Sequence, residues 1–386
     1  MTELDQPVAR RRWPRVLLTV VAVWFLLEMV SWAVLALLKP LPSDDILRLY
    51  RPHPYRVYML VPGAHSATGQ CSINSHGFRG PEIELRKPPG TVRIACLGDS
   101  TTFGDTATTD GHTYPAQLER LLRERYCHSE TPNSKPETRN STAPLRLEVI
   151  NAGVPGYTSL EALIYFETKL LDYQSDVAIL NVGLNDALFL ACFHDFASDY
   201  THARKVFEIP KPRLWERSAL LSLLLPHWRS VANPYRSAPG AELPDLTMTD
   251  PARLKVDEAE QRACFRPERI AIFARNVRNF IFVARGQSVL PILSTVLYRP
   301  EGEDFFAEVV EKMNESIRQT AVSLSVLCVD LAREMPSGPK AFVDACRLRD
   351  GPEGLERVGR IFADFLIRQG IMEQRIARKN SGSLAR

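Results

Sequence analysis

The sequence predicts an α/β protein with a five-stranded parallel sheet and helices on both faces, preceded by one N-terminal transmembrane helix. Between residues 92 and 369, short apolar runs bounded by Gly and Pro alternate with amphipathic stretches of ten or more residues. That alternation is typical of strand–helix–strand units in a parallel sheet. A single longer apolar run near the N-terminus lies outside this pattern and predicts the transmembrane helix.

Composition narrows the class of protein further. The chain has 386 residues, of which 45% are hydrophobic and 24% charged, with 48 Lys and Arg against 45 Asp and Glu. These values are near the averages for globular proteins and exclude a disordered chain, a collagen or a small disulfide scaffold. The net charge of +3 is almost cancelled, which argues against nucleic acid as a partner. No group of His, Cys and Asp has metal-ligand spacing, so we expect neither a metal nor a cofactor.

The apolar run covers residues 16–38 and is long enough to cross about 30 Å of hydrocarbon. It is too long for a signal-peptide core, and no small-x-small cleavage site follows it, which favours an uncleaved signal anchor. Four arginines precede it, so the positive-inside rule predicts that residues 1–15 form a cytoplasmic tail. The remainder of the chain would then be extracytoplasmic. A buried core helix is the alternative interpretation.

Glu28 lies near the middle of this run, where an acidic side chain is unfavourable by about 2.5–3.5 kcal/mol unless it is protonated or paired. One interpretation is that Glu28 binds a partner helix. The other is that a single acid among so many apolar side chains is tolerated. The sequence leaves both open, and it leaves the oligomeric state open as well.

The predicted elements divide the rest of the chain. Residues 40–91 form a small β-rich N-terminal element, and a main domain covers residues 92–372 with an insertion at about 188–265. The predicted strands are residues 92–97, 145–150, 177–182, 289–296 and 325–331. The predicted helices are residues 114–125, 159–171, 267–285, 304–322 and 352–369, and a loop covers 128–144. Residues 373–386 form a basic tail.

Three turns that follow predicted strands carry the candidate chemistry. Ser100 follows the first strand in a Gly-rich turn, Gly153 follows the second, and Asn185 follows the third. Carboxyl ends of parallel strands meet at one edge of a sheet, so these turns converge there. One hydroxyl nucleophile with backbone and amide N–H donors is the composition of an acyl-transfer site.

The segments LGDSTTFG, NAGVPGY and VGLND, in this order, resemble the SGNH or GDSL-type hydrolases, a family of esterases, lipases and acyltransferases. The resemblance implies a flavodoxin-like three-layer αβα fold. It implies that Ser100 is the nucleophile and that the oxyanion hole comprises its own N–H, the Gly153 N–H and the Asn185 amide. The segment INSHGFRGPE is similar to that of membrane-anchored bacterial members, which implies a cell-envelope location.

The resemblance fails at one position. The family's last motif is an Asp-x-x-His pair, in which the His takes the serine proton and the Asp orients the His. Here Asp344 matches the Asp, whereas Arg347 occupies the His position. A guanidinium stays protonated in proteins, so Arg347 cannot accept a proton from Ser100.

No other histidine is an obvious replacement. None lies in the chain after His227, and the eight positions are His53, His65, His76, His112, His128, His194, His202 and His227. His194 follows the third strand and could fold over the cleft, although a solvated surface histidine is the simpler interpretation. His112 is interpreted as a turn or cap residue. The seven cysteines are odd in number, and Cys192 with Cys264 is one candidate bridge across the insertion.

Two functions therefore stay open. The first is a membrane-anchored serine hydrolase or acyltransferase that uses Ser100 on an ester of an extracytoplasmic lipid or glycan, with an unconventional base or a water. The second is a catalytically silent binding or scaffold protein with the same fold, which the Arg347 substitution favours. Residues 16–38 would bind the lipid bilayer in either case.

Overall fold

The computed structural model describes residues 12–37, 49–66, 69–127, 145–194, 196–202, 218–224, 257–300, 304–336 and 338–382. The predicted loop 128–144 and most of the predicted cytoplasmic tail lie outside these residues. The chain divides into two compact units, which are described separately here. One comprises Met1–Ile46 and Glu208–Glu242, and the other comprises Leu47–Phe207 and Leu243–Arg386.

The larger unit contains the five-stranded parallel sheet that the sequence predicts. Its strands are β3 (Thr91–Gly98), β4 (Arg146–Gly153), β5 (Val177–Asn181), β6 (Leu290–Ser294) and β7 (Leu327–Val329), in the spatial order β4-β3-β5-β6-β7. The first strand, β3, thus lies between the second and the third. Winding reverses at this point, and in sheets of this kind ligands bind there, outside the carboxyl ends of the strands.

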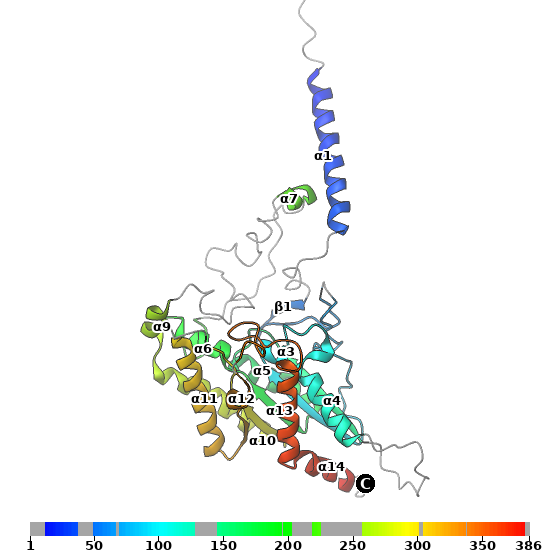
Figure 1. Ribbon diagram of the computed structural model, residues 1–386. Helices are drawn as coiled ribbons and strands as arrows, with labels where there is room; N and C mark the ends of the chain where they lie inside the picture. Colours follow the sequence, from blue (N-terminus) through cyan, green and yellow to red (C-terminus); the bar gives the residue numbers. More distant parts are fainter. Residues whose placement is uncertain are drawn as a thin grey trace, which may run out of the picture. The chain divides into compact units, whose positions relative to one another are not determined.

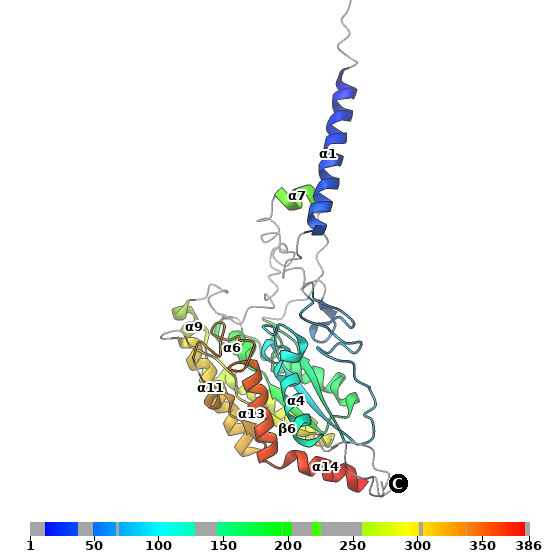
Figure 2. The same ribbon diagram turned by 45° about the vertical axis from the view of Figure 1, so that its right-hand side comes forward.

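Helices cover both faces of the sheet, which confirms the predicted three-layer arrangement. One face carries α4 (Tyr114–Tyr126) and α13 (Leu355–Arg368), which lie side by side in Figures 1 and 2. The other carries α5 (Ser159–Thr168), α10 (Ile270–Gly286) and α11 (Phe305–Ser323). Shorter described helices are α3 (Ser100–Phe103), η2 (Asp110–His112), η3 (Leu170–Tyr173), α6 (Leu184–Ala191), α9 (Glu258–Cys264), η6 (Pro267–Arg269) and α12 (Leu331–Glu334).

The core beneath α4 and α13 shows why these runs become strands. Val92, Ile94 and Cys96 alternate along β3, so all three side chains point to the same face and are fully buried there. Above them the rings of Tyr114 and Phe362 stack with centroids 5.2 Å apart. The register is therefore fixed by burial, because a slip of one residue would turn this apolar set away from the helices.

The segment before β3 contains a two-stranded antiparallel pair, β1 (Tyr50–His53) with β2 (Val57–Leu60). An isolated antiparallel bridge between Arg79 and Asn151 then attaches the following segment to β4.

The C-terminal residues, assigned above to a basic tail, are partly helical. Helix α14 (Ile371–Gly382) begins with Ile371 and Met372, both buried, so apolar burial extends helical structure into the residues assigned to the basic tail.

The smaller unit contains α1 (Arg12–Leu37) and α7 (Ala219–Leu224). Among the described helices, α1 alone is long and apolar enough to cross a membrane, over Trp13–Val34.

Of the predicted insertion, the structure describes residues 188–194, 196–202, 218–224 and 257–265. The candidate bridge at its ends was wrong: Cys192 and Cys264 are both free and buried. Burial raises the pKa of Cys192 to about 12, which leaves little of the thiolate that disulfide exchange requires.

Candidate active site

Ser100 is the first residue of α3 and follows β3 through a single residue, Asp99. The Asp99 side chain caps this short helix by accepting a hydrogen bond from the Thr101 N–H at 2.9 Å. Ser100 is 7% exposed. Its Oγ has no hydrogen-bond partner among the residues that the structure describes. The turn therefore holds a largely buried hydroxyl without a hydrogen-bond partner at the carboxyl edge of the sheet, as the sequence predicts.

Two glycines let α3 lie directly against the sheet. Gly98 and Gly153 are register partners at the ends of β3 and β4. A Cβ on Gly153 would lie 2.1 Å from the backbone N of Phe103, and a Cβ on Gly98 would lie 1.8 Å from the Thr102 Oγ1. No other residue fits at either position without moving α3, so these glycines bring the Ser100 turn and the end of β4 together.

Arg79 is a functional candidate that the sequence reasoning missed. Its guanidinium is buried and donates through Nη1 to the carbonyls of Phe103 at 3.2 Å and Gly104 at 2.5 Å, while Nε binds Asp110 at 2.8 Å. Those carbonyls end α3 and have no partner within the helix. Arg79 therefore fixes the far end of residues 100–104, called the nucleophile turn because the sequence predicts Ser100 as the nucleophile. Its position in INSHGFRGPE was the signal that could have revealed it.

The Gly153 N–H is not free in this conformation. It donates to Oδ1 of Asn151 at 3.1 Å, and Nδ2 of Asn151 donates in turn to the Phe103 carbonyl at 3.2 Å. Asn151 thus links the end of β4 to α3. To stabilise an oxyanion, the Gly153 N–H would have to share its proton or release Asn151. Its role as an oxyanion donor stays a prediction.

Asn185 lies in the first turn of α6 and is buried. Its Nδ2 donates to the Tyr157 carbonyl at 2.9 Å, and an amide nitrogen carries a second hydrogen for another acceptor. The next residue, Asp186, accepts from the Ser159 N–H and the Tyr200 hydroxyl, each at 2.8 Å. Burial raises the pKa of Asp186 to about 6. Asp186 thus ties the turn that carries Asn185 to α5.

Asp344 and Arg347 form one closed turn. The Asp344 Oδ2 accepts from Nε and Nη2 of Arg347 at 2.7 and 2.6 Å, and its Oδ1 accepts from the Arg347 backbone N–H at 2.8 Å. Partial burial opposes ionisation of Asp344, but the bonds from Arg347 outweigh it and lower the pKa to about 2. The carboxylate is thus occupied by a bidentate guanidinium, where the family pattern has an imidazole.

Asp105 shows that this pair lies near the nucleophile turn. Its backbone N–H donates to the Ser100 carbonyl at 3.3 Å. Desolvation of the carboxyl group raises the pKa of Asp105 to about 6, although the residue as a whole is exposed, and the charge of Arg347 counteracts part of the rise. Partly buried charges are screened much less by salt than exposed ones, so the Ser100 turn and Arg347 belong to one electrostatic environment.

His112, interpreted above as a turn or cap residue, makes a hydrogen bond to a carboxylate that the sequence did not reveal. Its Nδ1 lies 2.9 Å from Oδ2 of Asp350, which also accepts from the Thr108 N–H at 3.0 Å. The loop of His112 meets the nucleophile turn, because a Cβ on Gly104 would lie 2.8 Å from Thr113. With Nδ1 on a carboxylate, Nε2 carries the lone pair of the neutral ring, as in a serine-hydrolase triad.

The other histidine considered above is less well placed. His194 lies 3.4 Å from Glu260, and its side chain is 64% exposed, in line with a solvated surface residue. His128 and His227 lie outside the described residues.

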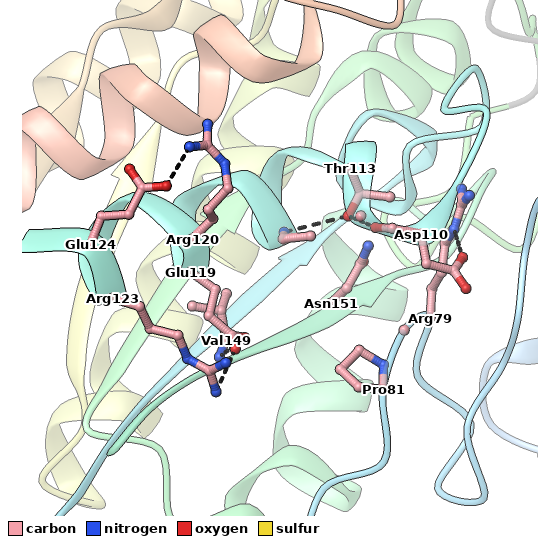
Figure 3. Close-up of a pocket in the computed structure, with 13 residues that line it drawn as sticks. Arg79, Pro81, Asp110, Thr113, Glu119, Arg120, Arg123, Glu124, Val149 and Asn151 are labelled. Carbon is pink, nitrogen blue, oxygen red and sulfur yellow. Dashed lines mark hydrogen bonds and ion pairs between the residues drawn. The ribbon is translucent and has the colours of Figure 1, made fainter. Parts of the chain in front are cut away.

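A pocket of about 480 Å³ lies along α4 and β4, and Figure 3 shows its lining side chains. None of Ser100, Gly153, Asn185 or Asp344 lines it. Its charged side chains are largely paired with each other, as Arg79 is with Asp110 and Arg123 with Glu119. Its lining thus differs from the acyl-transfer site that the sequence predicts.

Fold and site together define an α/β protein of the flavodoxin-like type with a serine at the carboxyl edge of its sheet. The GDSL-like Lipase/Acylhydrolase family model matches residues 96–348. The chain therefore belongs to the GDSL-like lipase/acylhydrolase family. This confirms the resemblance and, at the level of the family, the prediction of a hydrolase that acts on ester bonds.

Three solved structures are similar to the chain. A protein described as lipolytic and of the G-D-S-L family, from Desulfitobacterium hafniense, has 14% identity and a TM-score of 0.41, covering 71% of this chain and 99% of its own. A lipase/acylhydrolase from Enterococcus faecalis has 14% identity and a TM-score of 0.40, covering 71% and 95%. An acetylxylan esterase from Geobacillus stearothermophilus has 14% identity and a TM-score of 0.39, covering 72% and 93%. A search of curated proteins gives no significant match.

Because Asp99 is buried, its ionisation makes the stability of the fold depend on pH. Desolvation raises the pKa of Asp99 from 3.8 to about 7. The unfolded chain loses this proton near pH 4, whereas the folded chain keeps it until about pH 7, so this group destabilises the fold progressively between those values. Asp99→Asn still accepts from Thr101 but cannot ionise. We expect its melting temperature, relative to the wild type, to rise from pH 4.5 to pH 7.5 in detergent. A constant difference would contradict this assignment.

Proposed function

We propose that the chain is a membrane-anchored serine hydrolase in which Ser100 cleaves, or transfers the acyl group of, an ester in an extracytoplasmic lipid or glycan. The observation that carries the proposal is the unengaged Ser100 Oγ at the first turn of α3, which packs against the end of β4 at Gly153. The apolar length of α1 supports the anchor. The arginines before it support a cytoplasmic N-terminus.

In the proposed reaction, the Ser100 oxygen attacks the acyl carbon as its proton passes to a base. The carbonyl electron pair moves onto oxygen and forms a tetrahedral oxyanion, which N–H groups of Ser100, Gly153 and Asn185 would stabilise. The oxyanion collapses and expels the alcohol, which takes the proton. Water then hydrolyses the acyl-enzyme, or a second alcohol accepts the acyl group. No cofactor enters any step.

Because Arg347 occupies the position of the usual histidine and cannot accept a proton, the base in this mechanism must be another group. We propose that His112, oriented by Asp350, accepts the proton directly or through one water. Three observations support it: the 2.9 Å contact to Asp350, the exposed ring, and the contact of its loop with the turn that Ser100 begins. Asp350 follows Arg347 closely in the chain, so the orienting acid would shift from Asp344 to Asp350.

The proposal is tested with a fluorophosphonate probe on the full chain in detergent. We expect labelling that Ser100→Ala abolishes, because the probe reacts only with an activated hydroxyl. Ser323→Ala, at the exposed end of α11, is the matched control and should label like the wild type. His112→Ala should slow labelling by about 10²–10⁴, the usual contribution of a general base. Absence of labelling in the wild type would contradict the hydrolase.

The closed Asp344–Arg347 turn favours the second candidate, a catalytically silent member that binds an acylated envelope polymer. The same experiment separates the two. A silent protein would give no Ser100-dependent labelling, yet it would still retain an intact nucleophile turn.

A further inference from the structure

Glu28 of α1 is bound within the smaller unit by a segment far away in the chain. Its carboxylate accepts from the Ser218 Oγ at 2.8 Å, from the Leu220 N–H at 3.2 Å and from the Ala219 N–H. These donors are the first residues of α7 and the residue before it. Glu28 therefore satisfies N–H groups at the start of α7, which no carbonyl of that helix can reach.

Burial shows which face of α1 is covered. Among the side chains of α1 that the structure describes, only Glu28 is partly buried and only Ser31 is fully buried, at 4% exposed. The two lie three residues apart and thus on the same side of the helix. All other described positions of α1 are exposed, with large apolar side chains such as Trp24 and Phe25.

The position of Glu28 along α1 sets the depth of this contact. The apolar span ends at Val34, six residues after Glu28. With a rise of about 1.5 Å per residue, the carboxylate lies about 9 Å inside the span. If α1 crosses the bilayer, Glu28 and the start of α7 both lie in hydrocarbon.

In hydrocarbon, the Glu28 carboxylate and the N–H groups at the start of α7 would each be unfavourable without the other. An unpaired acidic side chain is costly in hydrocarbon, and so are unsatisfied backbone N–H groups. Paired, they satisfy each other. The rest of α7, with the sequence ALLSLL, offers leucines to its surroundings, and Leu224 is 66% exposed. Exposed leucines on a helix that lies beside a membrane span are suited to lipid acyl chains.

We propose that residues 218–224 enter the bilayer beside α1 as a second membrane-embedded segment, held by Glu28 and covered by lipid acyl chains. This inference rests on the proposed membrane anchor. It gives Glu28 a partner within its own chain, in place of a separate helix or a tolerated charge. The insertion of the hydrolase domain is thereby attached to the membrane at a second place.

Reaction with a membrane-impermeant maleimide in proteoliposomes tests the proposal. The full chain first receives Cys127→Ser and Cys328→Ser, since the other five cysteines are buried. Leu224→Cys is compared with Val322→Cys, a control whose side chain is 81% exposed on α11. We expect residue 224 to react at least about tenfold more slowly than residue 322, and at the same rate after denaturation in detergent.

Two further variants test the role of Glu28. Glu28→Leu removes the acceptor and should raise the reactivity at residue 224 toward that at residue 322. Glu28→Gln keeps an amide oxygen and should leave residue 224 protected. The proposal is overturned if residue 224 reacts as fast as residue 322 in the parent chain, or if Glu28→Leu leaves it protected. Alkaline carbonate extraction distinguishes the failures, because release of the chain from membranes would refute the anchor itself.

Discussion

In a chain that carries His112→Ala, replacement of Arg347 by histidine is expected to increase the rate of Ser100 labelling and of small-ester hydrolysis by about 10²–10⁴, the usual contribution of a general base. The guanidinium of Arg347 stays protonated and holds Asp344 through two hydrogen bonds. A neutral imidazole at this position could donate one ring N–H to Asp344 and offer the other nitrogen to the Ser100 proton. Steady-state hydrolysis of an aryl acetate measures the gain.

Three controls separate this gain from a mere loss of positive charge. Arg347→Gln in the same His112→Ala chain removes the guanidinium without adding a base and should leave the rate near that of His112→Ala alone. Addition of Asp344→Asn to Arg347→His should cancel most of the gain, because the imidazole loses its orienting carboxylate. Addition of Ser100→Ala should abolish it. If His112→Ala alone is as active as the wild type, another base is in use, and the proposed role of His112 is wrong.

Gly153→Ala is expected to lower the free energy of unfolding by about 1–3 kcal/mol and to abolish labelling of Ser100. The added methyl group would lie 2.1 Å from the N of Phe103 and 2.6 Å from the carbonyl carbon of Thr102, both backbone atoms of α3. Backbone cannot yield as a side chain can, so α3 must move away from β4 and take Ser100 with it. Chemical denaturation and probe labelling measure the two effects.

Gly286→Ala is the matched control for this substitution. Gly286 ends α10, and no atom lies within 4 Å of the position that a Cβ would occupy. The helix propensity of alanine should make this variant as stable as the wild type or slightly more stable. Unchanged stability and labelling in Gly153→Ala would contradict the close packing of α3 on β4.

Much of the fold was predictable because its signals are local. The apolar run at 92–97 and the amphipathic run at 114–125 correspond to β3 and α4, whose bounds differ by one residue or less. Ser100 was predictable for the same reason, since a Gly-rich turn directly after a buried strand has few alternatives. Such features depend on period and on neighbouring residues, which the sequence displays directly.

The rest of the site depends on pairs that the sequence does not display. His112 and Asp350 are 238 positions apart, and nothing local to either residue distinguishes the pair from a surface loop. The bond between the Gly153 N–H and Asn151 depends on a side-chain rotamer, which no spacing rule supplies. Glu28 was recognised as unusual, but its partners at the start of α7 lie about 190 positions away.

The contacts of Arg79 have a consequence for where the catalytic unit begins. The family match starts at residue 96 and the first strand of the sheet at Thr91, so a truncated fragment cut at either place would keep every nucleophile and oxyanion candidate. It would nevertheless lack the guanidinium that binds the carbonyls of Phe103 and Gly104. The smallest autonomous hydrolase must therefore include the preceding segment, at least from Gln70, whose carbonyl accepts from the same arginine.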